Sequence, residues 1–104
     1  MCDLRVSDIQ RMVDEWIKSF GGGYWNPLSM LAALVEEVGE LARALNSLEG
    51  GKGCGDIKFL VEEIGDVLFA LICISNYYGI DMGVALRKSV EKYTVRDANR
   101  WVKK

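Results

Sequence analysis

Two acidic motifs constrain the fold of this chain more than any other feature of its sequence. The segments Leu34–Leu41 and Leu60–Val67 each hold two carboxylates three residues apart within an otherwise apolar helical pattern. Residues at i and i+3 share one face of an α-helix, so each pair points in one direction. The two pairs mirror each other about Gly51 and Lys52, as in an antiparallel hairpin. Such a hairpin would bring together four carboxylates: Glu37, Glu40, Glu63 and Asp66.

Carboxylates that converge in this way need a compensating charge. Two like charges about 5 Å apart repel by roughly 3 kcal/mol at an effective dielectric constant of about 20. A whole small domain is stable by only about 5–15 kcal/mol. The four groups therefore stay apart, take up protons or bind cations. Oxygen ligands favour hard cations, so we expect Mg²⁺, or Mn²⁺ in its place.

Helical periodicity and capping signals divide the chain into four helices. Ser7 is the expected N-cap of the first helix, and a glycine triplet from residue 21 ends it. Asn26 before Pro27 starts the second helix, while Asp56 and Asp81 start the third and fourth. The predicted spans are Ser7–Phe20, Pro27–Leu48, Ile57–Tyr78 and Met82–Trp101, with a glycine-rich loop over Glu49–Gly55 and Gly79 closing the third helix.

No strand alternation interrupts this pattern, and 104 residues suffice for one domain with its own core. The third helix is apolar on every side from Val67 to Ile74, which predicts burial all round. One chain of this size covers such a segment with difficulty, so a subunit interface is the simpler explanation and a tightly wrapped monomer is the alternative. We therefore expect a single all-α domain over residues 1–104. Its protomer resembles an antiparallel four-helix bundle and packs into a homodimer or homotetramer (a dimer of dimers).

The composition excludes several classes of function. The chain has no histidine, and its three cysteines form no C-x-x-C motif, so ordinary zinc sites and histidine-containing di-iron sites are excluded. A net charge of −2 gives no general attraction to a nucleic-acid polymer or an anionic membrane. The longest apolar run is far too short to span a bilayer. The odd cysteine count and the lack of a signal-peptide pattern favour the cytoplasm.

Three cations and one aromatic residue complete the candidate site. Lys88, Lys92 and Arg96 recur every four residues and form a basic stripe on the last predicted helix. This stripe is either a solvated face or a phosphate contact opposite the metal. Trp25 precedes the second helix and either packs in the core or contacts a nucleotide base. Both alternatives remain open at this level.

At these residues the sequence resembles the MazG-type all-α nucleotide pyrophosphohydrolases. The family pattern E-E-x-x-E corresponds to Glu36–Glu40, and E-x-x-D corresponds to Glu63–Asp66. A weaker K-F-x-x-R motif corresponds to Lys92–Arg96, where Tyr93 replaces the usual phenylalanine. The similarity extends from about Tyr24 to Arg96, which is most of the chain.

The resemblance implies hydrolysis of (deoxy)nucleoside triphosphates between the α- and β-phosphates, which yields a monophosphate and pyrophosphate. It implies that the carboxylates of both motifs bind Mg²⁺, that Glu36 or Glu37 accepts a proton from water, and that the protein forms a homo-oligomer. It also implies that Lys92 and Arg96 contact phosphate. Two alternatives stay open: a non-catalytic helical oligomer with structural cations, and the same chemistry on phosphoribosyl-ATP. The expected site residues are Glu37, Glu40, Glu63 and Asp66 for metal, Glu36 and Glu37 for catalysis, and Lys88, Lys92, Arg96 and Trp25 for substrate.

Overall fold

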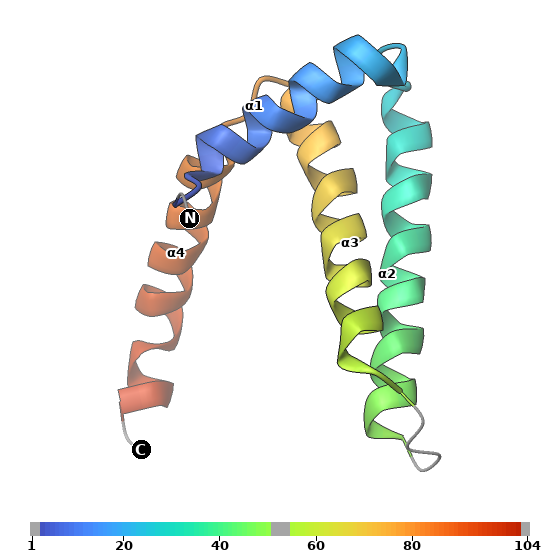
Figure 1. Ribbon diagram of the computed structural model, residues 1–104. Coiled ribbons are helices and arrows are strands. Elements are labelled where there is room, and N and C mark those ends of the chain that lie inside the picture. Colours follow the sequence, from blue (N-terminus) through green and yellow to red (C-terminus); the bar gives the residue numbers. More distant parts are fainter. Residues whose placement is uncertain (1–2, 51–54, 103–104) are drawn as a thin grey trace.

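Four α-helices and one π-helical turn make up the computed structural model, which describes residues 3–50 and 55–102 and the side chains as far as residue 98. Helices α2 and α3 run side by side in opposite directions, and α1 crosses their upper ends (Figure 1). No strand occurs in the described ranges, so the all-α prediction is confirmed. The elements are α1 (Val6–Trp16), η1 (Ile17–Gly21), α2 (Pro27–Glu49), α3 (Ile57–Tyr77) and α4 (Met82–Val102).

The predicted caps account for the starts of α2, α3 and α4. The Asn26 side chain accepts a hydrogen bond from the Ser29 amide at 3.0 Å. The Asp56 and Asp81 side chains do the same for amides at the starts of α3 and α4, at 3.0 and 3.1 Å. Gly79 follows α3 with a left-handed φ of 65°, as expected for a helix-terminating glycine. The predicted turn at Gly51 and Lys52 lies outside the described residues.

The first helix differs from its prediction at both ends. It begins at Val6, and its N-cap is Arg5 rather than Ser7, so that part of the prediction is wrong. The reason is local: the Asp8 carboxylate accepts a hydrogen bond from the Arg5 amide at 2.9 Å, which satisfies the helix start two residues earlier than predicted. At the other end the α-helix stops at Trp16 and continues as the π-helical turn, which a left-handed glycine at position 22 (φ 78°) closes.

The compact part of the molecule is the junction of α1 with the α2–α3 hairpin. Its buried side chains come from all three helices: Val13, Ile17, Met30, Ile72 and Cys73. Burial raises the pKa of the Cys73 thiol, as expected for a cysteine that packs as a small core residue. The core thus fixes the end of the hairpin that lies against α1.

A polar network ties α1 to α3 beside this core. The Gln10 amide group donates to the Asn76 side chain at 3.0 Å and to the Ile80 carbonyl at 2.8 Å. Asn76 in turn donates to the Gln10 carbonyl at 2.9 Å and to the Tyr24 hydroxyl at 3.2 Å. The same hydroxyl donates to Asp14 at 2.5 Å. Because both partners of Tyr24 belong to the junction, its hydroxyl group should contribute to folding stability.

We expect Tyr24→Phe to lower the free energy of unfolding by about 1–3 kcal/mol, since it removes a half-buried hydroxyl group and leaves the groups bonded to it without that hydrogen bond. Burial, followed by the bond to Asp14, raises the pKa of Tyr24 from 10.0 to about 12. A raised pKa means that this contribution is complete below pH 10 and declines as the pH rises towards 12. Thermal unfolding of wild type and of Tyr24→Phe between pH 8 and pH 11 should show that the difference between their melting temperatures becomes smaller at high pH. Tyr78→Phe, at a residue that is 58% exposed, is the control and should change little.

One chain leaves much apolar surface uncovered. On α2 the exposed apolar side chains follow helical spacing along one face, namely Leu28, Leu31, Val35, Val38 and Leu45. On α3 a similar row of exposed apolar side chains is formed by Ile57, Val61, Ile64, Leu68 and Leu71. We call these two rows the hairpin stripes. The sequence predicted burial for Leu68 and Leu71 within the segment Val67–Ile74, and a single chain does not provide it, because the apolar faces are wider than the contact between α2 and α3.

Helix α4 leaves the arrangement open on one side. It packs against α1 and stands apart from the hairpin along most of its length (Figure 1). The radius of gyration is 16.7 Å, compared with about 13 Å for a compact chain of about 100 residues. No helix within the described residues is long and apolar enough to cross a membrane.

Candidate metal centre

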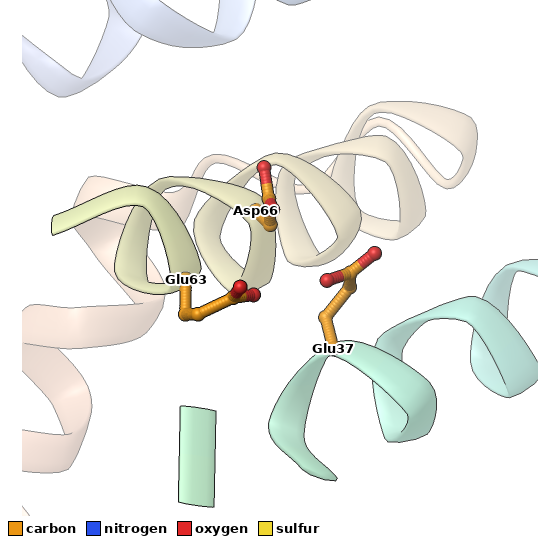
Figure 2. Close-up of side chains that lie close together, drawn as sticks. All are labelled: Glu37, Glu63 and Asp66. Atoms are coloured by element: carbon orange, nitrogen blue, oxygen red, sulfur yellow. The ribbon is translucent and has the colours of Figure 1, made fainter. Parts of the chain in front are cut away.

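Three of the four predicted carboxylates meet between α2 and α3. Oxygen atoms of Glu37, Glu63 and Asp66 all lie within 4.8 Å of one another. Figure 2 shows Glu37 on α2 facing Glu63 and Asp66 on α3. Glu63 and Asp66 share one face of α3 because they are three residues apart. The hairpin predicted from the mirrored motifs therefore does bring carboxylates from both helices to one place.

The environment of this cluster suits a cation. The Glu63 Oε1 atom is buried and accepts no hydrogen bond from any described group. Burial and the charges of Asp66, Glu37 and Glu40 raise the pKa of Glu63. Burial and the charges of Asp66, Glu36 and Glu40 raise the pKa of Glu37. An unpaired carboxylate oxygen among like charges is stabilised by a hard divalent ion, so the residues present fit Mg²⁺ or Mn²⁺.

The other two acidic residues of the first motif lie differently. Glu40 is half-buried but outside the cluster, and its Oε1 atom lies 3.9 Å from Arg43 Nε. Glu36 is exposed and also lies outside the cluster, although its charge contributes to the raised pKa of Glu37. Between the two residues proposed as the proton acceptor, Glu37 is therefore the one that the structure places beside the other carboxylates.

A cavity of about 340 Å³ opens beside the cluster, between α1, the loop that follows it, and the hairpin. Glu37 and Asp66 line one side of it, so it is continuous with the carboxylates. Trp25, which is 63% exposed, lies in its wall together with Trp16 and Phe69. The last two rings pack edge to face with centroids 5.7 Å apart. An apolar, aromatic cavity next to charged groups is typical of a small-molecule site.

The basic stripe does not reach the carboxylates within one chain. Lys88, Lys92 and Arg96 lie on α4 and line neither the cavity nor the carboxylate cluster. Arg96 instead bonds both oxygens of the neighbouring Asp97 at 3.1 Å. Lys92 and Arg96 also lie over the Tyr93 ring, at 4.9 and 4.8 Å from its centroid. Their predicted contact with phosphate remains a prediction.

Sequence reasoning missed two kinds of site residue. Trp16 and Phe69 were assigned only to helical apolar faces, and nothing in their spacing distinguishes a cavity wall from a core. Arg43 received no role, although a signal was present: it follows Glu40 by three residues and so lies on the same face of α2.

Comparison with known proteins agrees with these motifs. A family model of the MazG nucleotide pyrophosphohydrolase domain matches residues 25–101. The chain is 44% identical to the uncharacterised protein YpjD of Bacillus subtilis (strain 168), across 100% of this chain and 96% of that protein. It is also 28% identical to the uncharacterised protein YvdC of the same organism, across 89% of this chain and 96% of that protein.

Two crystal structures share the fold. One is of a Bacillus-conserved MazG protein described as a nucleotide pyrophosphohydrolase, with a TM-score of 0.79, 40% identity and coverage of 89% of this chain and 93% of that one. The other is of Bacillus subtilis YpjD, with a TM-score of 0.79, 42% identity and coverage of 92% and 93%. The matched span contains both carboxylate motifs and the lysine–arginine motif. The chain belongs to the MazG nucleotide pyrophosphohydrolase family.

Proposed function

We propose that this protein hydrolyses (deoxy)nucleoside triphosphates between the α- and β-phosphates, with Mg²⁺ as its cofactor, to give a nucleoside monophosphate and pyrophosphate. The observation that carries the proposal is the cluster of Glu37, Glu63 and Asp66 at the edge of an apolar cavity. A housekeeping role in the cytoplasmic nucleotide pool follows from this chemistry. The finer assignments below are parts of the same proposal.

The carboxylates of both helices hold the cation, with Glu40 as the fourth ligand. Bound Mg²⁺ supplies charge neutralisation for the phosphates and lowers the pKa of a coordinated water. The protein positions the proposed ligands, because α2 and α3 hold oxygen atoms of three carboxylates within 4.8 Å of one another. Glu37 also borders the cavity, where it can accept the proton of the attacking water.

The aromatic cavity holds the base and sugar. Trp25 is well placed for this role because its largely exposed ring stands in the cavity wall rather than in the core. Stacking on an aromatic ring accepts any base, and base–aromatic stacks contribute about 1–3 kcal/mol each in nucleic-acid complexes. Binding by stacking accounts for a triphosphate substrate without fixing which base is preferred.

A homo-oligomer follows from the uncovered surface. The hairpin stripes expose ten apolar side chains in two regular rows, and α4 leaves them accessible. Large contiguous apolar surfaces of this kind mark interaction sites in soluble proteins. A second copy of the chain offers the same stripes, as a self-complementary two-fold interface requires. We therefore propose a homodimer or a dimer of dimers.

The reaction itself is the first test. Purified protein with Mg²⁺ and a panel of standard, deoxy and modified triphosphates should release pyrophosphate and the monophosphate in equal amounts from at least one substrate. Chromatography of the nucleotide products and a pyrophosphate assay check this directly. Orthophosphate with a nucleoside diphosphate as the direct products would contradict cleavage between the α- and β-phosphates. Phosphoribosyl-ATP belongs in the same panel, because its turnover alone would assign the same chemistry to another substrate.

A further inference from the structure

A second, smaller hollow lies on the other side of the carboxylates, towards the loop end of the hairpin. Its volume is about 210 Å³. Glu40 and Glu63 line the side that faces the metal centre, and Ser47 and Phe59 line its far side. Arg43 is the only positively charged side chain among the described residues that line it. No residue of α4 contributes to this lining.

The two hollows and the carboxylates form a row along the hairpin. Moving down α2, Ala33 and Glu37 border the aromatic cavity, while Glu40 and Arg43 border the second hollow. At 1.5 Å per residue, Ala33 and Arg43 are separated by about 15 Å along the helix axis. Helix α3 repeats the order in reverse, because it is antiparallel to α2. The row therefore begins at the apolar, aromatic cavity, passes the candidate metal centre and ends at the second hollow, where the Arg43 side chain carries a positive charge.

A nucleoside triphosphate has its parts in the same order. Its base is flat and largely apolar on its faces, its α-phosphate lies in the middle, and its β- and γ-phosphates form the anionic end. Resting on the proposed function, we infer that the substrate lies lengthwise along the α2–α3 hairpin, and that Arg43 binds the β- and γ-phosphates in the second hollow. These two phosphates leave together as pyrophosphate.

The state of Arg43 fits this role. Its contact with Glu40 is 3.9 Å long, which exceeds hydrogen-bond distance, and its side chain is 78% exposed. No hydrogen bond to a described residue uses its guanidinium group. An exposed ion pair of this kind contributes little to folding. The planar guanidinium group has five N–H donors in a fork that matches phosphate oxygens, so its donors are available for a substrate.

The carboxylates around the second hollow would repel phosphates, so phosphate binding there requires a positively charged side chain. Glu40, Asp56 and Glu63 line the hollow with Arg43, so three carboxylates surround one cation there. A metal ion held by the carboxylates would offset part of their charge. For phosphates bound in the second hollow, the guanidinium group of Arg43 would be the neighbouring positive charge within the described lining.

The test compares Arg43→Ala with wild type in two measurements. Both use the triphosphate that wild type turns over best, and both follow monophosphate formation by chromatography. We expect Arg43→Ala to lower kcat/KM at least about tenfold, mainly through KM, since charge-assisted hydrogen bonds are among the stronger ones. We expect inhibition by added pyrophosphate to weaken by a similar factor, while inhibition by the nucleoside monophosphate stays within twofold. Arg43→Lys should have values of KM and of pyrophosphate inhibition between those of wild type and Arg43→Ala. An ammonium group keeps the positive charge but lacks the forked N–H donors of a guanidinium group.

Arg11→Ala is the matched control. Arg11 is also an exposed arginine paired with an acid three residues away, and it lies on α1, outside the carboxylate cluster. It should match wild type in both measurements. Unchanged KM and pyrophosphate inhibition in Arg43→Ala would overturn the inference, as would equal weakening of pyrophosphate and monophosphate inhibition. Either result leaves the proposed function standing, because that function fails only if wild type releases no pyrophosphate.

Discussion

Glu63→Gln is expected to lower kcat/KM at least about 100-fold and to raise the melting temperature of the metal-free protein. Glutamine keeps nearly the same volume and removes one negative charge from a group of carboxylates whose repulsion raises the pKa of Glu63. It also removes the buried Oε1 carboxylate oxygen that no described group satisfies. The same substitution thus reduces the repulsion in the metal-free protein and removes a proposed metal ligand, so activity and stability should change in opposite directions.

Two measurements check this expectation. Monophosphate formation at increasing Mg²⁺ concentrations gives the loss of activity, and thermal unfolding with and without Mg²⁺ gives the stability. Wild type should gain melting temperature when Mg²⁺ is added, since an ion that binds only the folded state stabilises it. Without Mg²⁺, Glu63→Gln should already have most of the increase in melting temperature that Mg²⁺ gives to wild type. Glu62→Gln, at the exposed neighbouring residue, should retain activity and its response to Mg²⁺. A fully active Glu63→Gln variant would remove Glu63 from the site.

Leu31→Glu is expected to dissociate the proposed oligomer into single chains. Leu31 is 48% exposed in one chain and lies between Leu28 and Val35 in the α2 stripe. Burying a leucine side chain contributes about 1.5–3 kcal/mol, and burying an unpaired carboxylate costs more than that gain. A two-fold interface contains the substitution twice, so the dissociation constant should rise by several orders of magnitude. Light scattering coupled to size-exclusion chromatography would show the mass of one chain.

The control for this experiment is Val95→Glu on α4. Val95 is 80% exposed, and its neighbours one turn earlier are the charged residues Glu91 and Lys92. A charge introduced there should leave the oligomer intact. If Leu31→Glu keeps the mass of the wild-type oligomer at micromolar concentration, the hairpin stripes are not the interface.

The sequence predicted the parts of the fold that local chemistry decides. Caps at Asn26, Asp56 and Asp81 are short-range hydrogen bonds, and the structure confirms each of them. The antiparallel hairpin followed from the mirror symmetry of two motifs, which no single helix could show. The prediction was wrong at the start of α1, where the Asp8 side chain rather than Ser7 makes the capping interaction.

The arrangement of helices was beyond prediction for a physical reason. Periodicity reports which faces are apolar but not which surface covers them, so Leu68 and Leu71 lie in the segment predicted to be buried although one chain leaves them 41% and 40% exposed. The same limit applies to the site. Spacing placed Glu37, Glu63 and Asp66 on facing helices and Glu40 on the same face of α2 as Arg43. Whether the Glu40 side chain turns towards Arg43 or towards the other carboxylates depends on side-chain rotamers, which spacing does not encode.

The link between Gln10 and Asn76 has a consequence for the order of folding. These two residues are 66 positions apart in the chain, so the junction of α1 with α3 closes a long loop. The hairpin joins helices that are neighbours in sequence, and contacts of short separation form earlier because their loop-closure entropy is smaller. We therefore expect the carboxylates of α2 and α3 to approach one another before Trp16 packs into the cavity wall. On this expectation the repulsive cluster forms first and the aromatic cavity beside it is completed later.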